Sequence, residues 1–228
     1  YGSVTQPVSW GSAGASAVAF PSTTCTIGGS GGGSIRLIAS TQLAVDGKIS
    51  ADGDPSPLDS KFYSLVYDKG SSTAKDFRVG YYIAGGGGSG GSVWITTGQL
   101  AGGSGIISAN GGAGRTGCTG GAGCATKATQ GGAGGGGRVA LYVGAAAMVF
   151  PLSRVHAAGG SGVSADNAAG AGTIYTHFGD GSNALVTIRN DDRPATKSTT
   201  AAWPESEGDM RQGSRRVSFS IEDQLLTA

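Results

Sequence analysis

The chain has 228 residues, 45 of them glycine, and a formal net charge of +1 at pH 7. Low charge with plentiful β-branched residues excludes a disordered chain, and glycine that does not recur at every third position excludes collagen. Basic residues are scattered, so we expect no nucleic-acid partner, and no apolar run reaches the roughly 18 residues of a membrane span. Because the chain starts at Tyr1 without methionine, we expect a processed product.

The N-terminal segment carries a weak alternation of apolar residues at Val8, Trp10, Val18 and Phe20. Such alternation is typical of strands with one buried face. We predict that residues 1–27 form a cap or coil that covers one end of the fold.

A two-strand unit then recurs four times between residues 28 and 192. "GGSIRLIASTQLAVDGKISADGD", from Gly32, aligns with "GGSVWITTGQLAGGSGIISANGG", from Gly90, at a constant offset of 58. A third copy starts at Gly136, with Val155 in its second strand after a two-residue insertion, and a fourth starts at Gly172, where Ile188 answers Ile49. First strands are thus offset by 58, 46 and 35 residues.

These units predict an all-β fold, a parallel β-solenoid in the form of a right-handed β-helix. A lone unit cannot bury its apolar face, whereas stacked units bury all such faces in one core. We expect Val139, Leu141 and Val143 to face inward, with Ala140 and Tyr142 outward. An antiparallel sandwich of glycine-linked hairpins is the alternative.

The offsets exceed a plain coil, so the sequence predicts long loops that leave the coil at one corner. One runs from Asp54 to Ala84, and another, rich in glycine, from Gly111 to Gly137. Glycine runs are typical of flexible linkers. They also allow polyproline-II-like segments (a polyglycine-II-like arrangement) to pack side by side, because no Cβ keeps the backbones apart. Both interpretations stay open.

Gly90–Ile95, Gly105–Gly112 and Gly134–Tyr142 carry glycine-rich strand starts and a G-x-ISA-x-GG turn. In these motifs the chain resembles glycine-rich, β-helical cell-surface proteins such as adhesins, autotransporter-like passengers and filament proteins. The resemblance covers roughly residues 28–192. It implies extracellular structural or adhesive work and no particular molecule.

Cys118 and Cys124 enclose five flexible residues, which favours a disulfide and an oxidising compartment. The alternative is a pair of free thiols. Zinc would need a second ligand pair that the sequence lacks, so we expect no metal. Cys25 is left over, either free or bridged to another chain.

The composition changes at Arg193, and residues 193–228 read as a linker followed by a strand. The strand places Val217, Phe219 and Ile221 on one face. It would cap its own coil or pair with a neighbouring copy. Abundant Ser and Thr leave O-glycosylation open, while the absence of Asn-x-Ser/Thr excludes N-glycosylation.

Catalysis has no support in these motifs, and we expect neither an enzyme nor a cofactor. The acidic residues Asp52 and Asp191 fall at turn corners, where capping explains them. Trp94, Tyr142 and Tyr175 should point outward on successive coils, as a contact surface for sugars or for another subunit, or as plain loop cover.

We therefore expect an extracellular structural protein, a subunit of a surface filament or coat assembled head-to-tail from copies of itself. The second hypothesis is an adhesin or passenger domain that binds surface glycans through its loops. A polysaccharide-active β-helix enzyme is the third.

Overall fold

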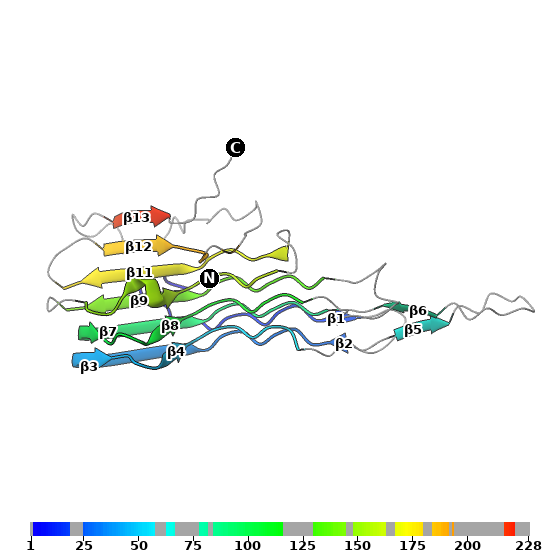
Figure 1. Ribbon diagram of the computed structural model, residues 1–228, viewed down its shortest axis with the longest axis horizontal. Coiled ribbons are helices and arrows are strands. Elements are labelled where there is room, and N and C mark those ends of the chain that lie inside the picture. Colours follow the sequence, from blue (N-terminus) through cyan, green and yellow to red (C-terminus); the bar gives the residue numbers. More distant parts are fainter. Residues whose placement is uncertain are drawn as a thin grey trace, which may run out of the picture.

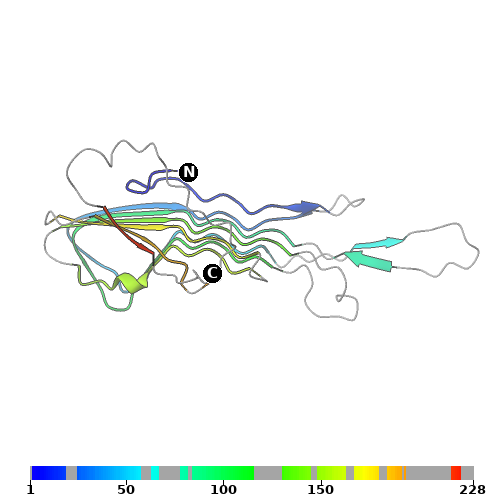
Figure 2. The same cartoon turned by 90° about the horizontal axis from the view of Figure 1, so that it is seen from above.

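The computed structural model describes residues 2–18, 25–57, 63–66, 78–81, 84–115, 130–144, 148–162, 167–179, 184–191, 193 and 217–221. Two facing sheets occupy one end of an elongated body, and extended segments run side by side toward the other end (Figure 1, Figure 2). Helix is almost absent from these residues and includes a 3-10 turn at Leu152–Arg154.

The larger sheet has six strands in the spatial order β13-β12-β11-β9-β7-β3. Their bounds are β3 Ser34–Ala44, β7 Ser92–Ala101, β9 Arg138–Val143, β11 Thr173–Phe178, β12 Ala184–Ile188 and β13 Val217–Ile221. β3, β7, β9 and β11 are parallel, with Ser34 opposite Ser92, Ser92 opposite Arg138, and Arg138 opposite Thr173. The sequence offsets of 58, 46 and 35 residues are therefore the register of these pairs.

The smaller sheet consists of β4 (Lys48–Ser50), β8 (Ile106–Ser108) and β10 (Val155–His156), all parallel. Ile107 lies opposite both Ile49 and Val155. The predicted two-residue insertion in the third unit is confirmed by this register.

Hydrophobic cores lie on both faces of the larger sheet. Val139, Leu141 and Val143 belong to the core shared with the smaller sheet, as their alternation predicted. Ala140 is on the opposite face, yet it is also fully buried, in a second cluster with Val4 and partly buried Tyr142. The N-terminal residues therefore cover a face that the sequence predicted to be open.

Glycine-rich segments extend both sheets in two rows. The first row leads into the strands of the larger sheet and comprises segments 27–33, 84–91, 130–137 and 167–172. The second row continues the strands of the smaller sheet and comprises segments 51–57, 109–115 and 157–162. Residues 9–16, here called the N-terminal segment, lie lengthwise on the first row rather than across one end of the fold.

Successive N–H groups of segment 84–91 point to three different neighbours and return to the first neighbour after three residues. Gly86 and Ser89 donate to the N-terminal segment, Gly87 and Gly90 to segment 130–137, and Gly88 and Gly91 to segment 51–57. Three residues per turn without internal hydrogen bonds is typical of a polyproline II helix. Each segment is thus bonded on several sides, unlike a strand in a sheet.

The rows approach so closely that most of their glycines have no room for a side chain. A Cβ on Gly134 would lie 1.9 Å from the carbonyl oxygen of Gly88, and one on Gly111 would lie 1.8 Å from that of Gly134. Only glycine permits this backbone contact. The glycine content of these segments is therefore a packing requirement.

Two antiparallel hairpins lie toward the end of the body away from the sheets (Figure 1). β1 (Ala17–Val18) pairs with β2 (Cys25–Thr26), and β5 (Tyr63–Val66) pairs with β6 (Arg78–Tyr81). Each pair therefore joins strands that follow one another in the order of elements along the chain.

The predicted all-β parallel β-solenoid, a right-handed β-helix, is wrong. Parallel and antiparallel strands are mixed: β12 runs antiparallel to β11 in the larger sheet, so Ile188 does not continue the smaller sheet as Ile49 does. In the expected loops 54–84 and 111–137, the described residues 54–57, 84, 111–115 and 130–137 are backbone-bonded parts of the rows rather than flexible linker. Of the two interpretations of the glycine runs, their hydrogen bonds support the side-by-side, polyproline-II-like packing. In a sequence, glycine is normally taken as a signal for a turn or loop. Packing by backbone groups leaves no periodic pattern of side chains that would indicate otherwise.

Candidate functional site

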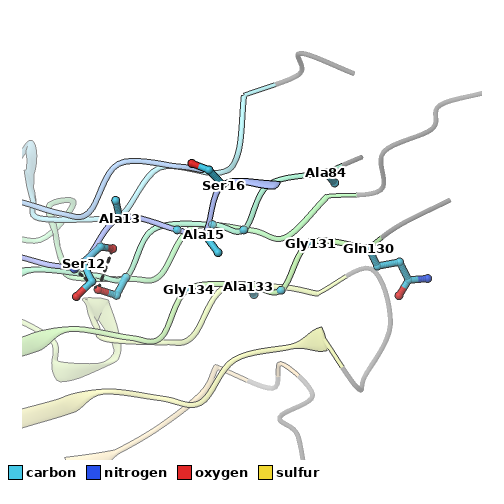
Figure 3. A pocket seen from close by; sticks show the side chains of 14 residues that line it. Ser12, Ala13, Ala15, Ser16, Ala84, Gln130, Gly131, Ala133 and Gly134 are labelled. Carbon is cyan, nitrogen blue, oxygen red and sulfur yellow. Dashed lines mark hydrogen bonds between the residues drawn. The ribbon is translucent and has the colours of Figure 1, made fainter. Parts of the chain in front are cut away.

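A groove runs along the N-terminal segment on the surface of the first row (Figure 3). Gly11 and Gly14 N–H donate to the carbonyls of Gly32 and Gly29, both at 2.8 Å. In return the carbonyls of Ser12 and Ala15 accept from the next segment, 84–91. The N-terminal segment is thereby fixed above the line where segments 27–33 and 84–91 meet.

Beside it lie two hollows of about 450 and 520 Å³, lined by the N-terminal segment and segments 84–91 and 130–137. Ser89 borders both hollows, and its Oγ accepts from Ser12 N–H at 2.6 Å. Trp10 borders the second hollow and is 81% exposed. Apart from Trp10, Gln130 and Arg138, the linings offer small side chains, hydroxyls and backbone groups. Such a surface suits an uncharged, extended ligand.

The predicted aromatic column does form on the larger sheet. Ring centroids of Trp94 and Tyr142 are 6.3 Å apart, and those of Tyr142 and Tyr175 are 5.5 Å apart. The guanidinium of Arg36 lies 4.1 Å from the Trp94 ring centroid, within cation–π range.

The column is not an open platform, however. Tyr175 is only 8% exposed, and Tyr142 Oη–H donates to the Thr5 carbonyl at 3.0 Å. Trp94 Nε1 is buried without a hydrogen-bond partner among the described residues. These three aromatic residues thus serve mainly as the second core beneath the N-terminal residues. Trp10, which the sequence placed in a cap, is by contrast 81% exposed.

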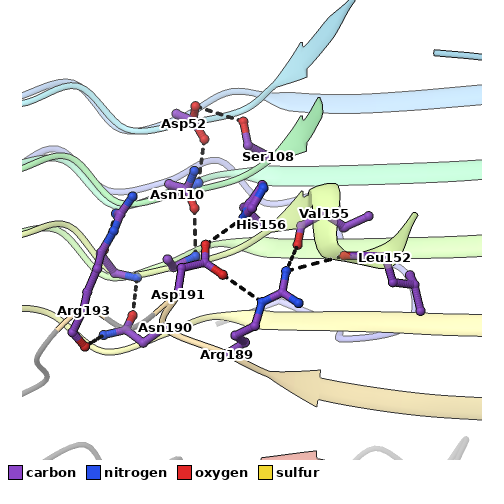
Figure 4. A network of polar contacts seen from close by, with 12 residues as sticks. Asp52, Ser108, Asn110, Leu152, Val155, His156, Arg189, Asn190, Asp191 and Arg193 are labelled. Atoms are coloured by element: carbon purple, nitrogen blue, oxygen red, sulfur yellow. Dashed lines mark hydrogen bonds and ion pairs between the residues drawn. The ribbon is translucent and has the colours of Figure 1, made fainter. Parts of the chain in front are cut away.

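A ladder of polar side chains crosses the corner where the smaller sheet meets the second row (Figure 4). The Asp52 carboxylate accepts from Asn110 N–H at 2.6 Å and from Ser108 Oγ–H at 2.9 Å. Asn110 Oδ1 in turn accepts from Ala158 N–H at 2.8 Å. The side chain at each corner therefore accepts a hydrogen bond from the backbone of the next unit. Asp52 has the predicted capping role, and Asn110, at the equivalent position of the next unit, has the same role.

Burial of Asp52 raises the pKa of its carboxyl, but hydrogen bonds from Lys48, Asn110, Ser50 and Ser108 outweigh it and hold that pKa below its ordinary value. The carboxylate is therefore the favoured form in the folded chain. Four donors bind the two oxygens of the Asp52 carboxylate.

The last corner is closed by an ionic cluster. Asp191, whose φ is 51°, contacts His156 Nδ1 at 2.7 Å and accepts from Arg189 Nε at 2.7 Å. Arg189 also donates to the Val155 carbonyl at 2.7 Å. Positive φ is tolerated by Asp better than by most residues. The predicted capping role of Asp191 thus extends to joining the end of β12 to the smaller sheet.

Other predicted residues divide into two groups. Val217, Phe219 and Ile221 lie in β13, which pairs with β12 of the same chain, so the strand caps its own sheet. Cys118 and Cys124 fall outside the described residues.

Among the residues that the structure describes, no group of three or more His, Cys, Asp or Glu could hold a metal ion, and no helix is long and apolar enough to cross a membrane. Comparison with known proteins finds no matching family model, no matching curated protein and no matching solved structure. The resemblance to glycine-rich surface proteins stays a prediction.

Proposed function

We propose that the protein is an extracellular structural protein, the subunit of a surface filament or coat assembled head-to-tail from copies of itself. The supporting observation is that the six-stranded sheet ends in strands with one hydrogen-bonded neighbour each, β3 and β13, among the described residues. Open edges are templates for pairing with another chain.

The two edges suit one another. β13 runs opposite to β3, because β12 reverses direction after β11 and β13 is parallel to β12. A copy translated along the stack would bring β13 against β3 in antiparallel pairing. β3 is 11 residues long, and Ile38 within it is 68% exposed. A long edge strand that exposes an apolar side chain is what natural monomers avoid.

Ile38→Lys tests this role, since lysine on an edge opposes pairing. The change should cost the monomer less than about 0.5 kcal/mol because the side chain is largely exposed. Val149→Lys is the matched control, an equally apolar side chain that is 63% exposed and lies outside the strands. Electron microscopy and light scattering should show assemblies for the wild-type chain and the control, and monomers for Ile38→Lys.

Monodisperse wild-type monomers at all concentrations would contradict the proposal. So would an Ile38→Lys variant that assembles as well as the wild-type chain.

Glycan binding by an adhesin or passenger domain is the second candidate, and exposed Trp10 beside the second hollow favours it. Indole faces stack on sugar rings, and Ser9 and Ser12 supply hydroxyls nearby. Trp10→Ala should abolish binding on a glycan array, while the half-buried Trp94 should not be required. Neither hollow is lined by an acidic residue, which leaves a polysaccharide-active enzyme without a supporting observation.

A further inference from the structure

Two neighbouring segments of the first row meet along a line on the surface, here called a furrow, and the N-terminal segment lies in the furrow between segments 27–33 and 84–91. Its contacts show what a furrow needs in order to hold an extended chain. Its Gly11 and Gly14 carbonyl oxygens lie 2.0 Å from where Cβ atoms of Gly31 and Gly28 would be, so both floor positions must be glycine. The carbonyls of Gly29 and Gly32 accept hydrogen bonds from the segment, and the N–H groups of Gly86 and Ser89 donate to it. These six positions define a docking pattern.

The sheet register transfers this pattern along the row. Adding 58 and then 46 to the floor positions 28 and 31 gives 86 and 89, then 132 and 135. The next furrow, between segments 84–91 and 130–137, has serine at 89, and the Ser89 side chain already fills that space beside the N-terminal segment. This furrow therefore lacks the two floor glycines of the docking pattern.

The furrow between segments 130–137 and 167–172, here called the open furrow, has the complete pattern. Gly132 and Gly135 form its floor, and no atom of the residues that the structure describes lies within 4 Å of a Cβ built on either. The register gives the carbonyls of Ala133 and Gly136 as acceptors and the N–H groups of Asn167 and Gly170 as donors. None of these four groups has a hydrogen-bond partner among the described residues.

We infer that the open furrow binds the N-terminal segment, Ser9–Ser16, of a second copy of this chain. That segment must first leave its own furrow, because its backbone N–H and carbonyl groups can be bonded in only one furrow at a time. That segment carries glycine at 11 and 14, the spacing that brings both glycines onto the floor of a threefold extended chain. Its other residues are small apart from Trp10. The contact rests on the proposed assembly from copies, and it adds a second junction between them.

The test is self-association of the full chain with both Gly132 and Gly135 changed to alanine. The new methyl groups meet no atom of the described residues within 4 Å, but they would collide with carbonyls of the incoming segment. The control is Gly47→Ala with Gly103→Ala, whose positions are equally open and lie outside the rows. Sedimentation equilibrium should show association weakened about tenfold or more by the furrow variant only, since each hydrogen bond lost is worth a factor of about five.

A competitor sharpens the result. A synthetic peptide of residues 9–16 should dissociate wild-type copies, and the same peptide with Gly11→Ala and Gly14→Ala should not. Equal association of the furrow variant and the control would overturn the inference, as would a wild-type chain indifferent to the peptide. If Ile38→Lys abolishes assembly while the furrow variant assembles normally, the proposed function stands and the furrow contact falls.

Discussion

Gly134→Ala is the most direct test of the backbone-packed rows. Its Cβ would lie 1.9 Å from the Gly88 oxygen, and side-chain carbons essentially never come closer than 3.0 Å, so the segments must part by about 1.1 Å. The separation weakens the two hydrogen bonds that join these segments, from Gly87 N–H to the Gly132 carbonyl and from Gly90 N–H to the Gly135 carbonyl, both at 2.9 Å.

The two bonds contribute about 1 kcal/mol each, and overpacking adds about 1–3 kcal/mol. We therefore expect the free energy of unfolding to fall by about 3–5 kcal/mol. At roughly 2–4 °C per kcal/mol for a chain of this size, a loss of 3 kcal/mol lowers Tm by about 6–12 °C.

Gly132→Ala, two residues earlier in the same segment, is the matched control. In the described part of the chain nothing lies within 4 Å of its Cβ, and its φ is outside the left-handed region. Gly132→Ala should therefore raise stability by about 0.4–1 kcal/mol through the unfolded state. Urea unfolding followed by tryptophan fluorescence measures both variants. The reasoning fails if the two stabilities lie within about 0.5 kcal/mol of one another.

Three further predictions concern side chains. Because the pKa of Asp52 is lowered on folding, its stabilisation is present above its unfolded pKa and is lost as pH falls through the lower folded value; the stability gap to Asp52→Asn, from urea titrations, should shrink below about pH 4. Tyr142→Phe removes the bond to Thr5 and should cost about 1 kcal/mol, with faster proteolysis before residue 9 as the readout; unchanged proteolysis would contradict it. Ser89→Ala leaves Ser12 N–H without its acceptor and should speed hydrogen exchange at that amide, measured by NMR.

Part of the fold could be predicted because strands leave a trace in side-chain periodicity. The constant offset between Ser34 and Ser92 is the observed register, and the insertion before Val155 was placed correctly. The fourth unit failed because alternation does not tell which sheet a strand joins: Ile188 repeats the pattern of Ile49 but belongs to an antiparallel pair in the other sheet.

The candidate site could not be predicted for a different reason. Tyr142 was expected to be open, yet its cover comes from Thr5, 137 residues earlier, and such a contact leaves no local signal. The glycine rows hold by backbone groups alone, so only their glycine content is visible in sequence. Gly28, Gly86 and Gly132 occupy equivalent positions at the offsets of 58 and 46 residues. Once the rows were known, this recurrence of glycine could have indicated where another chain can lie against them.

The threefold directions of the N–H groups in segment 84–91 have a consequence for how order in this protein is detected. Residues that any strand count scores as coil are tied to neighbours on several sides, so their amides should exchange with solvent as slowly as those of the sheets. Circular dichroism would read the rows as unfolded chain, since polyproline II is also a major conformer of unfolded chains. Much of this molecule's rigidity is thus invisible to methods that equate order with helix and sheet.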